Sequence, residues 1–496
     1  MPDEEIIREI NMSENKSSMK IGKNAFLGAA GIILVLMVVS GILTLILPSG
    51  EYERVEVEGR TMIVADSYTE VEKPDYPVWR WFTAPLEVLG APGNIAVITI
   101  ILFIVFVSGS IAILEGAGVM KDLVAKLVSR FKTRKYLLMA IMLFMFMFLS
   151  SFLGIYEGLV PMIIFIVPLA YSLGWDSLTG LGISLLPLAF GFAAAVTNPF
   201  TVAIAQGIAE LPLFSGSWLR IIFFVVVYVI LYFFVSRYAK KIDANPERSL
   251  VYTEDQARKA LQNPEESSEI LEASHPGMKN ALIWFACCMG IAITFVILTS
   301  IIPAISDLSF PLMGLMFFIG GIGAGNFARL SGREIAKSFV NGITGMIPGI
   351  VLILMAYSVK HIIDRGMITD TILNAAAGWI ESAPTLGAAF LIYLITLIMN
   401  FFIGSASAKA FLMMPILTPL ADLVGITRQT AVLAFDFGDG FSNMLFPSNA
   451  LLLIALGFTV VSYPRWFRWT FPLQIIMLAV TSLFLVFAVF IEFGPF

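Results

Sequence analysis

Apolar runs of about 20 residues recur along the chain, and each is long enough to cross the hydrocarbon core of a bilayer as a helix. These runs predict spanning helices near residues 24–47, 94–117, 215–238, 279–302, 308–328, 343–363 and 465–490. The polar segment ahead of the first run contains acidic residues and lacks the pattern of a cleavable signal. We therefore expect an all-α integral membrane protein that retains its first helix.

Two further stretches, 134–212 and 384–458, are apolar but interrupted by glycine, proline and small polar residues in an order that recurs. Asn449 follows Asn198 by 251 positions, and the glycine-rich cluster ahead of each asparagine recurs at nearly the same interval. A constant offset of this kind indicates an internal repeat. Each stretch predicts a re-entrant hairpin with a glycine-rich tip, followed by a broken helix.

The predicted hairpins cover residues 134–173 and 384–425, and the predicted broken helices cover residues 175–212 and 427–458. Non-helical backbone at membrane depth is tolerated only where protein or a water-filled cavity satisfies its N–H and C=O groups. An odd number of crossings separates the two hairpins, so the repeats must have opposite orientations in the membrane. About nine spans in two inverted repeats with paired broken helices are typical of a secondary transporter with its site at the midplane.

Charged residues at the ends of the spans predict their orientation. Residues 118–135 carry six Lys or Arg side chains and one Asp, whereas residues 48–92 carry nine acidic and four basic side chains. Because cytoplasmic loops are enriched in Lys and Arg, we expect a cytoplasmic N-terminus, an external loop at 48–92 and an external C-terminus.

This orientation divides the chain into four parts. They are a cytoplasmic N-terminal tail at 1–23, a first membrane repeat at 24–238, a cytoplasmic linker at 239–278 and a second membrane repeat at 279–496. Within the external loop, charged and apolar residues alternate over 51–72 around a Glu-Gly pair, which predicts a β-hairpin. A short helix near residues 254–261 is expected in the linker.

Composition agrees with a chain that lies mainly in lipid. Of its 496 residues, 58% are hydrophobic and 14% are charged, whereas soluble domains carry about 25% charged residues. The 31 basic and 36 acidic residues give a formal charge of −5, which offers no electrostatic basis for binding nucleic acid. The two cysteines are adjacent, the two histidines are far apart, and a phosphate-binding loop is missing. We therefore expect neither an enzyme nor a cofactor or metal.

Polar residues at the two tips and the two breaks are the candidate binding groups. A broken helix presents unpaired N–H groups at one half-helix start and unpaired carbonyls at the other end, so one break can bind anions and cations. The alternative role for a single Ser or Asn is a helix-packing contact. The candidate substrate-binding residues are Tyr156, Glu157, Thr197, Asn198, Thr201, Ser405, Ser407, Lys409, Asp436, Asp439, Ser442, Asn443, Ser448 and Asn449.

Charges within the membrane are a sharper signal, because each is costly at the bilayer centre and must be paired or solvated. Four residues qualify, namely Glu157, Lys409, Asp436 and Asp439, and the two aspartates share one helix face. One basic and three acidic groups give 1 − 3 = −2 near the midplane, which favours a substrate or coupling ion with positive charge. A purely structural ion pair, Glu157 with Lys409 or Lys409 with Asp439, is the alternative.

Lys409 leads to a specific hypothesis about ion coupling. An ammonium group at a hairpin tip would stand where a coupling cation otherwise binds, so transport would be independent of sodium or linked to protons. The candidate groups for a coupling ion, Na⁺ or H⁺, or for this built-in cation are Glu157, Asn198, Lys409, Asp439 and Asn449.

Four strings in the breaks and near them carry a resemblance to a known family. They are Val-Thr-Asn-Pro-Phe at 196–200, Ala-Gln-Gly-Ile-Ala at 205–209, Leu-Phe-Ser-Gly at 213–216 and Phe-Gly-Asp-Gly-Phe-Ser at 437–442, with Pro447 downstream. The chain resembles the YfcC branch of the DcuC/ArcD-like transporters within the ion-transporter superfamily. This resemblance implies a homodimeric, elevator-type secondary carrier in a prokaryotic plasma membrane, with substrate and ion sites at the tips and breaks.

One string departs from that family. The second tip is Ser-Ala-Ser-Ala-Lys at 405–409, where the resemblance leads us to expect Ser-Gly-Ser-Gly-Gln. The departure places Lys409 where the family has a neutral side chain, and it bears directly on ion coupling.

The sequence therefore predicts transport of an amino acid, arginine-like or ornithine-like, by exchange or ion-coupled symport. The substrate carboxylate would meet the half-helix N-termini near Asn198 or Asn449, and its amine would meet Asp436, Asp439 or Glu157. The alternative within the class is a carrier of four-carbon dicarboxylates, other small carboxylates or peptides, with Lys409 as a substrate ligand. A channel and a membrane scaffold are the alternatives from other classes.

Overall fold

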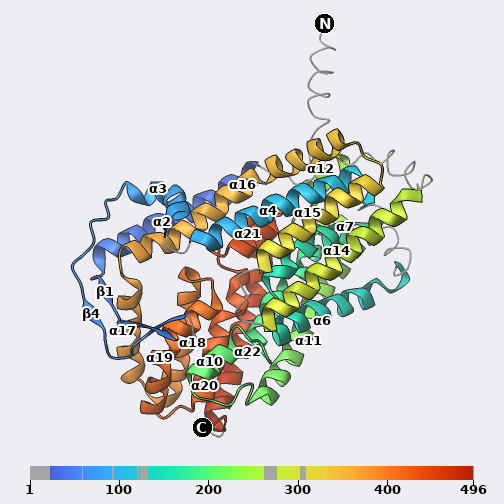
Figure 1. The fold of residues 1–496 in the computed structure, drawn as a ribbon. Coiled ribbons are helices and arrows are strands. Elements are labelled where there is room, and N and C mark those ends of the chain that lie inside the picture. The colour runs from blue at the N-terminus through green and yellow to red at the C-terminus, as the bar shows by residue number, and fades with distance from the viewer. Residues whose placement is uncertain are drawn as a thin grey trace.

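The computed structural model describes residues 23–57, 60–91, 94–119, 122, 132–261, 276–301 and 309–494. These residues form a mostly helical molecule in which long helices lie side by side (Figure 1). In these ranges, nine helical segments are long and apolar enough to cross a membrane. The expectation of a helical membrane protein with many spans is confirmed.

Long helices and a few short strands make up the first half of the chain. Its elements are α2 (Lys23–Ile46), β1 (Gly50–Glu51), β2 (Arg54–Val57), β3 (Arg60–Ile63), β4 (Thr69–Glu70), α3 (Arg80–Glu87), η1 (Val88–Gly90), α4 (Asn94–Gly116), η2 (Lys132–Arg134), α6 (Lys135–Leu153), η3 (Glu157–Met162), α7 (Ile163–Ser172), α8 (Ser177–Ser184), α9 (Leu186–Ala194), α10 (Val202–Ile208) and α11 (Ser217–Ala244). The apolar runs near 24–47, 94–117 and 215–238 correspond to α2, α4 and α11.

The second half begins with two short linker helices and continues with long ones. Its elements are η4 (Pro246–Arg248), α12 (Tyr252–Leu261), α14 (Pro276–Ile301), α15 (Ser309–Phe327), α16 (Gly332–Arg365), α17 (Thr369–Glu381), α18 (Thr385–Phe402), α19 (Ala406–Leu423), α20 (Arg428–Asp439), η6 (Phe441–Met444), α21 (Ala450–Gly457) and α22 (Tyr463–Phe490). The runs near 279–302, 308–328 and 465–490 correspond to α14, α15 and α22.

Helix α16 is longer than its apolar run, which predicts a helix only over 343–363. It begins at Gly332, where the side chain of Ser331 accepts a hydrogen bond from the Glu334 amide and the Glu334 side chain accepts one from the Ser331 amide. This capping box stabilises a polar first turn that a hydrophobic pattern does not register.

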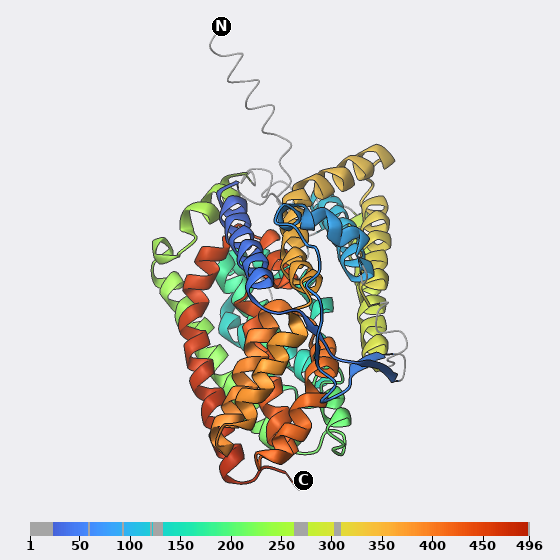
Figure 2. The same ribbon diagram turned by 90° about the vertical axis from the view of Figure 1, so that its left-hand side faces the viewer.

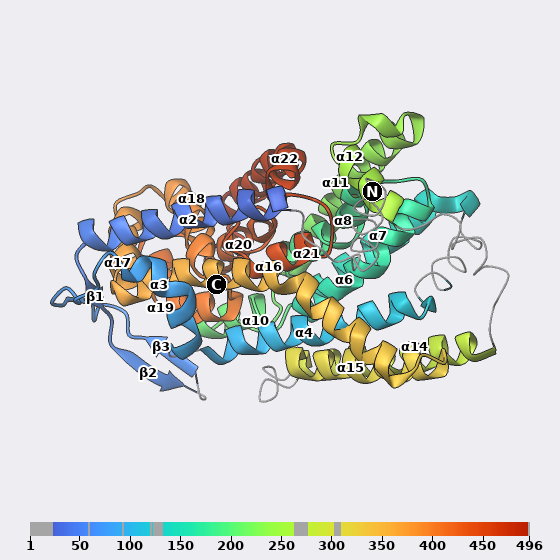
Figure 3. The same ribbon diagram turned by 90° about the horizontal axis from the view of Figure 1, so that it is seen from above.

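The long helices form two groups. In one group α4 packs against α15 and α16, α16 packs against α2, and α14 packs against α15. In the other group α9 packs against α6, α11 and α20, and α20 also packs against α18 and α22. Seen from above, the two groups lie next to each other (Figure 3).

The exposed faces of the long helices are apolar. Ile46 at the end of α2 is 71% exposed and Phe490 at the end of α22 is 86% exposed. Helices that expose large apolar side chains in this way are solvated by lipid. In contrast, the apolar segment Ser177–Ala194, which comprises α8 and α9, is 100% buried within the protein. The polar residues that follow α9 therefore lie in the interior of the molecule.

An outer strap crosses one end of the molecule. We use this name for residues 49–57 and 60–71, which carry the four short strands. β2 pairs antiparallel with β3 on either side of positions 58 and 59, as the alternation predicts, and β1 pairs with β4. Figure 2 shows the strap running in front of the helices of the second half. The amide of Gly50 donates to the Met367 carbonyl at 2.9 Å and Ser49 Oγ donates to the Gly366 carbonyl at 2.7 Å, so the strap is fastened to the connection between α16 and α17.

The linker contains a short helix, α12, as predicted. This helix is hydrogen-bonded to residues of the first half of the chain. Asp255 on α12 is buried, and its carboxylate accepts hydrogen bonds from the Ser177 amide at 3.0 Å and the Tyr171 hydroxyl at 2.8 Å. Burial raises the pKa of Asp255 above its usual range.

Candidate functional site

The first break separates α9 from α10 and is held by the end of α6. Helix α9 ends where Ala195 adopts a left-handed backbone with φ of 42°. Thr197 Oγ1 donates a hydrogen bond to the Phe152 carbonyl at 2.9 Å. Asn198 Oδ1 accepts one from the Phe200 amide at 2.8 Å, whereas Asn198 Nδ2 has no hydrogen-bond partner among the described residues.

The first tip lies directly against this break. Gly154 has a φ of +68°, and a Cβ placed there would lie 2.6 Å from Asn198 Oδ1, so both the backbone and the close approach require glycine. Tyr156 is buried, with its hydroxyl 3.9 Å from Met444 Sδ near the second break. Glu157 begins η3, and its side chain lies outside the described part of the structure.

The second break lies between α20 and α21. Asn449 caps α21, because its Oδ1 accepts hydrogen bonds from the amides of Leu451 at 2.9 Å and Leu452 at 3.3 Å. Ser448 Oγ donates to the Phe401 carbonyl, 2.6 Å away at the end of α18. In each half, therefore, a hydroxyl of the break is bonded to one of the last carbonyls of the helix ahead of the tip.

The second tip separates α18 from α19. Ser405 caps α19 by accepting a hydrogen bond from the Ala408 amide at 3.4 Å. Ser407 Oγ donates to the Phe200 carbonyl at 3.0 Å and so reaches the first break. Each tip thus contacts the break of the other half, since Tyr156 in the first tip reaches Met444.

Helices α9 and α20 cross next to both breaks. A Cβ on Gly440 would lie 2.2 Å from the Cα atom of Ala193, so the two backbones are in direct contact. The absence of a side chain at Gly440 allows this approach. The crossing brings the residues of both breaks into one interior region.

Lys409 and Asp439 form an ion pair in this region. Both side chains are completely buried, Lys409 Nζ contacts Asp439 Oδ1, and it also donates to Asn400 Oδ1. Of the two structural ion pairs that the sequence left open, the one with Asp439 is present. A buried charge is stable only when it is paired and hydrogen-bonded, and here both conditions are met for the ammonium group.

Asn400 connects this ion pair to the second break. Its Nδ2 lies 2.8 Å from the Asp439 carbonyl, 2.7 Å from Ser442 Oγ and 3.2 Å from Asn443 Oδ1. Asn449 Nδ2 donates to the same Asn443 Oδ1 at 2.8 Å. Asn400 is not among the candidate residues predicted from the sequence. A single amide in an apolar run directly before a predicted tip could have identified it.

Asp436 has different neighbours from Asp439. It is 1% exposed, lies beside the Thr201 hydroxyl of the first break, and is close enough to the Arg220 guanidinium for their charges to interact. Neither carboxylate oxygen of Asp436 makes a hydrogen bond with the described residues. Both aspartates lie on α20, as expected. Asp436 lies beside the first break, whereas Asp439 pairs with Lys409 beside the second tip.

Arg220 corrects the predicted charge of the site. It is completely buried at the start of α11. Arg220 is not among the four intramembrane charges predicted from the sequence. Among the described side chains, Asp436 and Asp439 balance Lys409 and Arg220, so the net charge is 2 − 2 = 0. The predicted count of −2 included Glu157, whose side chain lies outside the described part of the structure, and it lacked the cation that Arg220 adds. Helix α11 buries Arg220 beside α10 and α20, and sequence spacing alone does not reveal this.

A neutral polar network holds Arg220. Its Nη2 donates to the Ser215 carbonyl at 2.9 Å. The same carbonyl accepts a hydrogen bond from Gln206 Nε2 at 2.9 Å, and Gln206 Nε2 also lies 3.0 Å from Gln429 Oε1. This network joins α10, α11 and α20 and orients the guanidinium group.

The two breaks differ in how far their polar atoms are satisfied. Around the second break, Ser448, Asn449 and Asn400 all bond to neighbouring groups, and the Asp439 carboxylate, which has no hydrogen bond to the described residues, is paired with the Lys409 ammonium group. Around the first break, the buried polar atoms without a hydrogen bond to the described residues are Asn198 Nδ2, Thr201 Oγ1, Arg220 Nε, Arg220 Nη1 and both carboxylate oxygens of Asp436. Such groups are costly to bury unpaired. They offer donors and acceptors of both charges to a bound molecule.

The side chains in the described ranges contain no group of three or more His, Cys, Asp or Glu residues that could hold a metal ion. The chemistry available at the breaks is therefore that of hydrogen bonds and charge pairs.

The sequence is similar to one transporter family over most of its length. Residues 28–490 match the family model of DcuC, described as a C4-dicarboxylate anaerobic carrier. A relative in Escherichia coli (strain K12), named "Putative basic amino acid antiporter YfcC", is 30% identical over 469 residues, 88% of this chain and 91% of that protein. An uncharacterized protein of Haemophilus influenzae is 26% identical over 398 residues, 79% of this chain and 76% of that protein.

Two solved transporter structures show weaker similarity. The Alcanivorax borkumensis YdaH transporter is 17% identical, with 95% of this chain and 100% of that chain covered and a TM-score of 0.39. Neisseria gonorrhoeae MtrF, from a class of antimetabolite efflux pumps, is 18% identical, with 93% and 95% covered and a TM-score of 0.41.

Proposed function

The chain belongs to the DcuC family of membrane transporters, and from this membership we propose that it is a secondary active transporter of an amino acid. A basic amino acid is the first candidate, because the Escherichia coli relative is named for basic amino acids. Transport proceeds by exchange or by ion-coupled symport across a prokaryotic plasma membrane. The family description and the relative that carries a functional name are those of transporters, and this supports a function other than catalysis.

The observation that carries the proposal is the group of unsatisfied polar atoms at the first break. Asp436 offers two acceptor oxygens to an ammonium group, and Arg220 offers Nε–H and Nη1–H to a carboxylate. Thr201 and Asn198 supply neutral groups beside them. An α-amino acid carries its ammonium and carboxylate groups on the same carbon atom, so it matches a site in which the Asp436 carboxylate lies near the Arg220 guanidinium. We assign the side-chain cation of a basic substrate to Glu157, which begins η3 at the first tip.

The arrangement of elements supports an inverted repeat and an elevator mechanism as parts of the proposal. In each half a tip is followed by a helix that breaks, and the hydroxyls of Thr197 and Ser448 make equivalent anchoring bonds. The group of helices around α9 and α20, which carries the tips and breaks, would move as a unit against the group formed by α2, α4, α14, α15 and α16. In this scheme the group formed by α2, α4, α14, α15 and α16 contacts the same group of a second chain in a homodimer. The N-terminus is cytoplasmic and the C-terminus is external.

Lys409 acts as a built-in cation in this proposal. Its ammonium group contacts Asp439 and Asn400 beside the second tip, a position where a coupling cation would find the same oxygen ligands. Transport should therefore be independent of sodium. In Lys409→Gln a neutral amide replaces the ammonium group, and uptake that becomes sodium-dependent in this variant would support the role. Sodium-dependent uptake by the unaltered protein would contradict it.

A four-carbon dicarboxylate is the second candidate substrate. The family description favours it, and Arg220 and Lys409 place two buried cations near the breaks. The two carboxylates of such a substrate would bind Arg220 and Lys409. Asp436 then has no role in binding the substrate, which separates this candidate from the first.

The deciding experiment is exchange in proteoliposomes that contain the full chain. Vesicles loaded with unlabelled arginine, ornithine or succinate are given labelled arginine or labelled succinate, with and without sodium. Arginine entry only against internal arginine or ornithine supports the proposal, and its loss in Asp436→Asn assigns the amine to that carboxylate. Succinate entry alone would replace the amino acid by a dicarboxylate. Ion currents far above the turnover of a carrier would indicate a channel, and neither flux nor binding would indicate a scaffold.

A further inference from the structure

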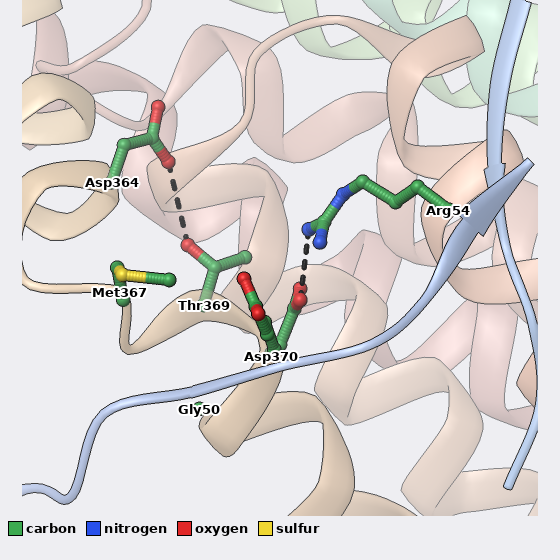
Figure 4. A pocket seen from close by; sticks show the side chains of 7 residues that line it. Gly50, Arg54, Asp364, Met367, Thr369 and Asp370 are labelled. Carbon is green, nitrogen blue, oxygen red and sulfur yellow. Dashed lines mark hydrogen bonds and ion pairs between the residues drawn. The ribbon is translucent and has the colours of Figure 1, made fainter. Parts of the chain in front are cut away.

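A pocket lies between the outer strap and the connection from α16 to α17, on elements separate from the breaks (Figure 4). We call it the strap pocket. Its volume of about 370 Å³ falls within the range of small-molecule sites. The side chains that line it include those of Glu51, Arg54, Asp364, Met367, Thr369 and Asp370.

Asp370 gives this pocket an unsatisfied acceptor. The residue is 3% exposed, and its Oδ2 accepts hydrogen bonds from the Tyr52 amide at 2.9 Å and from Arg54 Nη2 at 2.8 Å. Its Oδ1 is buried and has no hydrogen-bond partner among the described residues. A buried carboxylate oxygen without a donor is unfavourable. A ligand in the pocket that donates an N–H group to Oδ1 would remove this deficit.

The charge of the lining selects the kind of ligand. Glu51, Asp364 and Asp370 oppose the single cation Arg54, so the lining carries 1 − 3 = −2. Lys360 Nζ lies 3.5 Å from Asp364 Oδ2, and these two side chains are 47% and 48% exposed, so their attraction is weakened by solvent. A cation is therefore favoured over a neutral molecule or an anion.

The spacing of the oxygens favours an organic cation over a metal ion. Ca²⁺ takes about six to eight oxygen ligands at roughly 2.3–2.6 Å from one point. No group of three or more acidic or other ligating side chains in the described ranges converges closely enough to hold a metal. An alkylammonium or guanidinium group instead carries several N–H donors, which can reach oxygens that lie further apart.

We propose that the strap pocket binds a small organic cation, with an ammonium or guanidinium group held by Asp370 and Asp364. This site is additional to the transport site and does not depend on the identity of the transported substrate. Asp364 lies at the end of α16 and Asp370 at the start of α17, so the ligand joins these two helices beside Arg54 of the strap, which already donates to Asp370. Helix α17 leads into α18 and the second tip. Binding of the ligand stabilises the conformation in which the strap is hydrogen-bonded to α17 and to the connection between α16 and α17.

Calorimetric titration of the full chain in lipid nanodiscs with agmatine tests this proposal. Agmatine carries an ammonium and a guanidinium group but no carboxylate. Asp370→Asn and Asp364→Asn should each weaken binding by roughly tenfold or more, since each removes a charged hydrogen-bond acceptor. Glu72→Gln, at an exposed acidic residue just beyond the strap that is not part of the lining, should leave the affinity unchanged.

A second set of variants separates this site from the transport site. Asp436→Asn should retain agmatine binding at the strap pocket, whatever it does to transport. If Asp370→Asn does not fold, Asp364→Asn and Glu51→Gln carry the test, because both side chains are substantially exposed. Unchanged affinity in Asp364→Asn, loss of binding in Asp436→Asn alone, or binding of Ca²⁺ without binding of agmatine would each overturn the proposal.

Discussion

Removal of one partner from the Lys409–Asp439 pair should destabilise the protein far more than removal of both. The two side chains are completely buried, so Lys409→Met leaves the Asp439 carboxylate without a counter-charge in the interior. Breaking a buried pair in this way costs about 3–5 kcal/mol. The same range applies to Asp439→Asn, which leaves the ammonium group unpaired. Asn400 Oδ1 also loses its donor in Lys409→Met, which adds about 1–3 kcal/mol.

The double variant Lys409→Met/Asp439→Asn contains no buried charge at this position. Its cost should be about 1–3 kcal/mol, which is the penalty for the unsatisfied oxygen of Asn400. If the single changes acted independently, the double variant would lose about 7–13 kcal/mol, the sum of two pair-breaking costs and the Asn400 penalty. The predicted coupling between the two side chains is therefore about 4 kcal/mol or more.

Equilibrium unfolding of the purified protein in mixed micelles measures these free energies. The fluorescence of its eight tryptophans reports the transition as the fraction of denaturing detergent rises. Lys337→Met, at an exposed lysine on α16, is the matched control and should change the free energy of unfolding by less than about 0.5 kcal/mol. Additive losses in the double variant, or a loss in Lys409→Met no larger than in the control, would refute a buried ion pair at the second break.

Three further changes test the cap of α21, the crossing of α9 and α20, and the Arg80–Glu87 ion pair on α3. Asn449→Ala removes the cap of α21 and should cost about 1 kcal/mol in the free energy of unfolding, measured as above; no change would mean that the cap is not formed. Gly440→Ala should prevent correct folding, seen as loss of the monodisperse peak in size-exclusion chromatography, because its Cβ would lie 2.2 Å from Ala193 Cα; a well-folded, active variant would contradict the close helix crossing. The hydrogen-bonded Arg80 guanidinium lowers the pKa of Glu87 from 4.5 to about 2, so this carboxylate stabilises the protein above pH 4.5 and loses that effect as the pH falls toward 2. Thermal melts from pH 7 to pH 3 should therefore show a smaller decrease in Glu87→Gln than in the unaltered protein, and equal decreases would contradict this assignment.

The positions of the long helices follow from local composition. A helix satisfies its own backbone hydrogen bonds, so a run of apolar residues of sufficient length predicts a spanning segment without any knowledge of its neighbours. The elements α2, α4, α11, α14, α15 and α22 lie where those runs are. The interruptions near Asn198 and Asn449 predict the breaks in the same way, because the helix-breaking residues act on the adjacent backbone. The strands β2 and β3 follow from the alternation of charged and apolar residues.

The partners of the buried charges do not follow from local composition. Asp436 and Asp439 are one helical turn apart, yet Asp439 pairs with Lys409 whereas Asp436 lies beside Thr201 and near Arg220. Each of these partners is distant in sequence, and only the packing of α20 between the two halves of the chain selects them. Arg220 was not predicted for the same reason, since its burial depends on how α11 packs beside α10 and α20.

The sequence by itself therefore determined that this chain is a helical membrane protein with two tips, two breaks and several buried charges, since these features depend on the order of residues within single segments. Only the tertiary structure decided that Asn400 and Arg220 join the site, that each tip contacts the opposite break and that the charges of the described side chains cancel. Hydrogen bonds and ion pairs act over a few ångströms, and the distances that decide them are set by how the helices pack rather than by spacing along the chain.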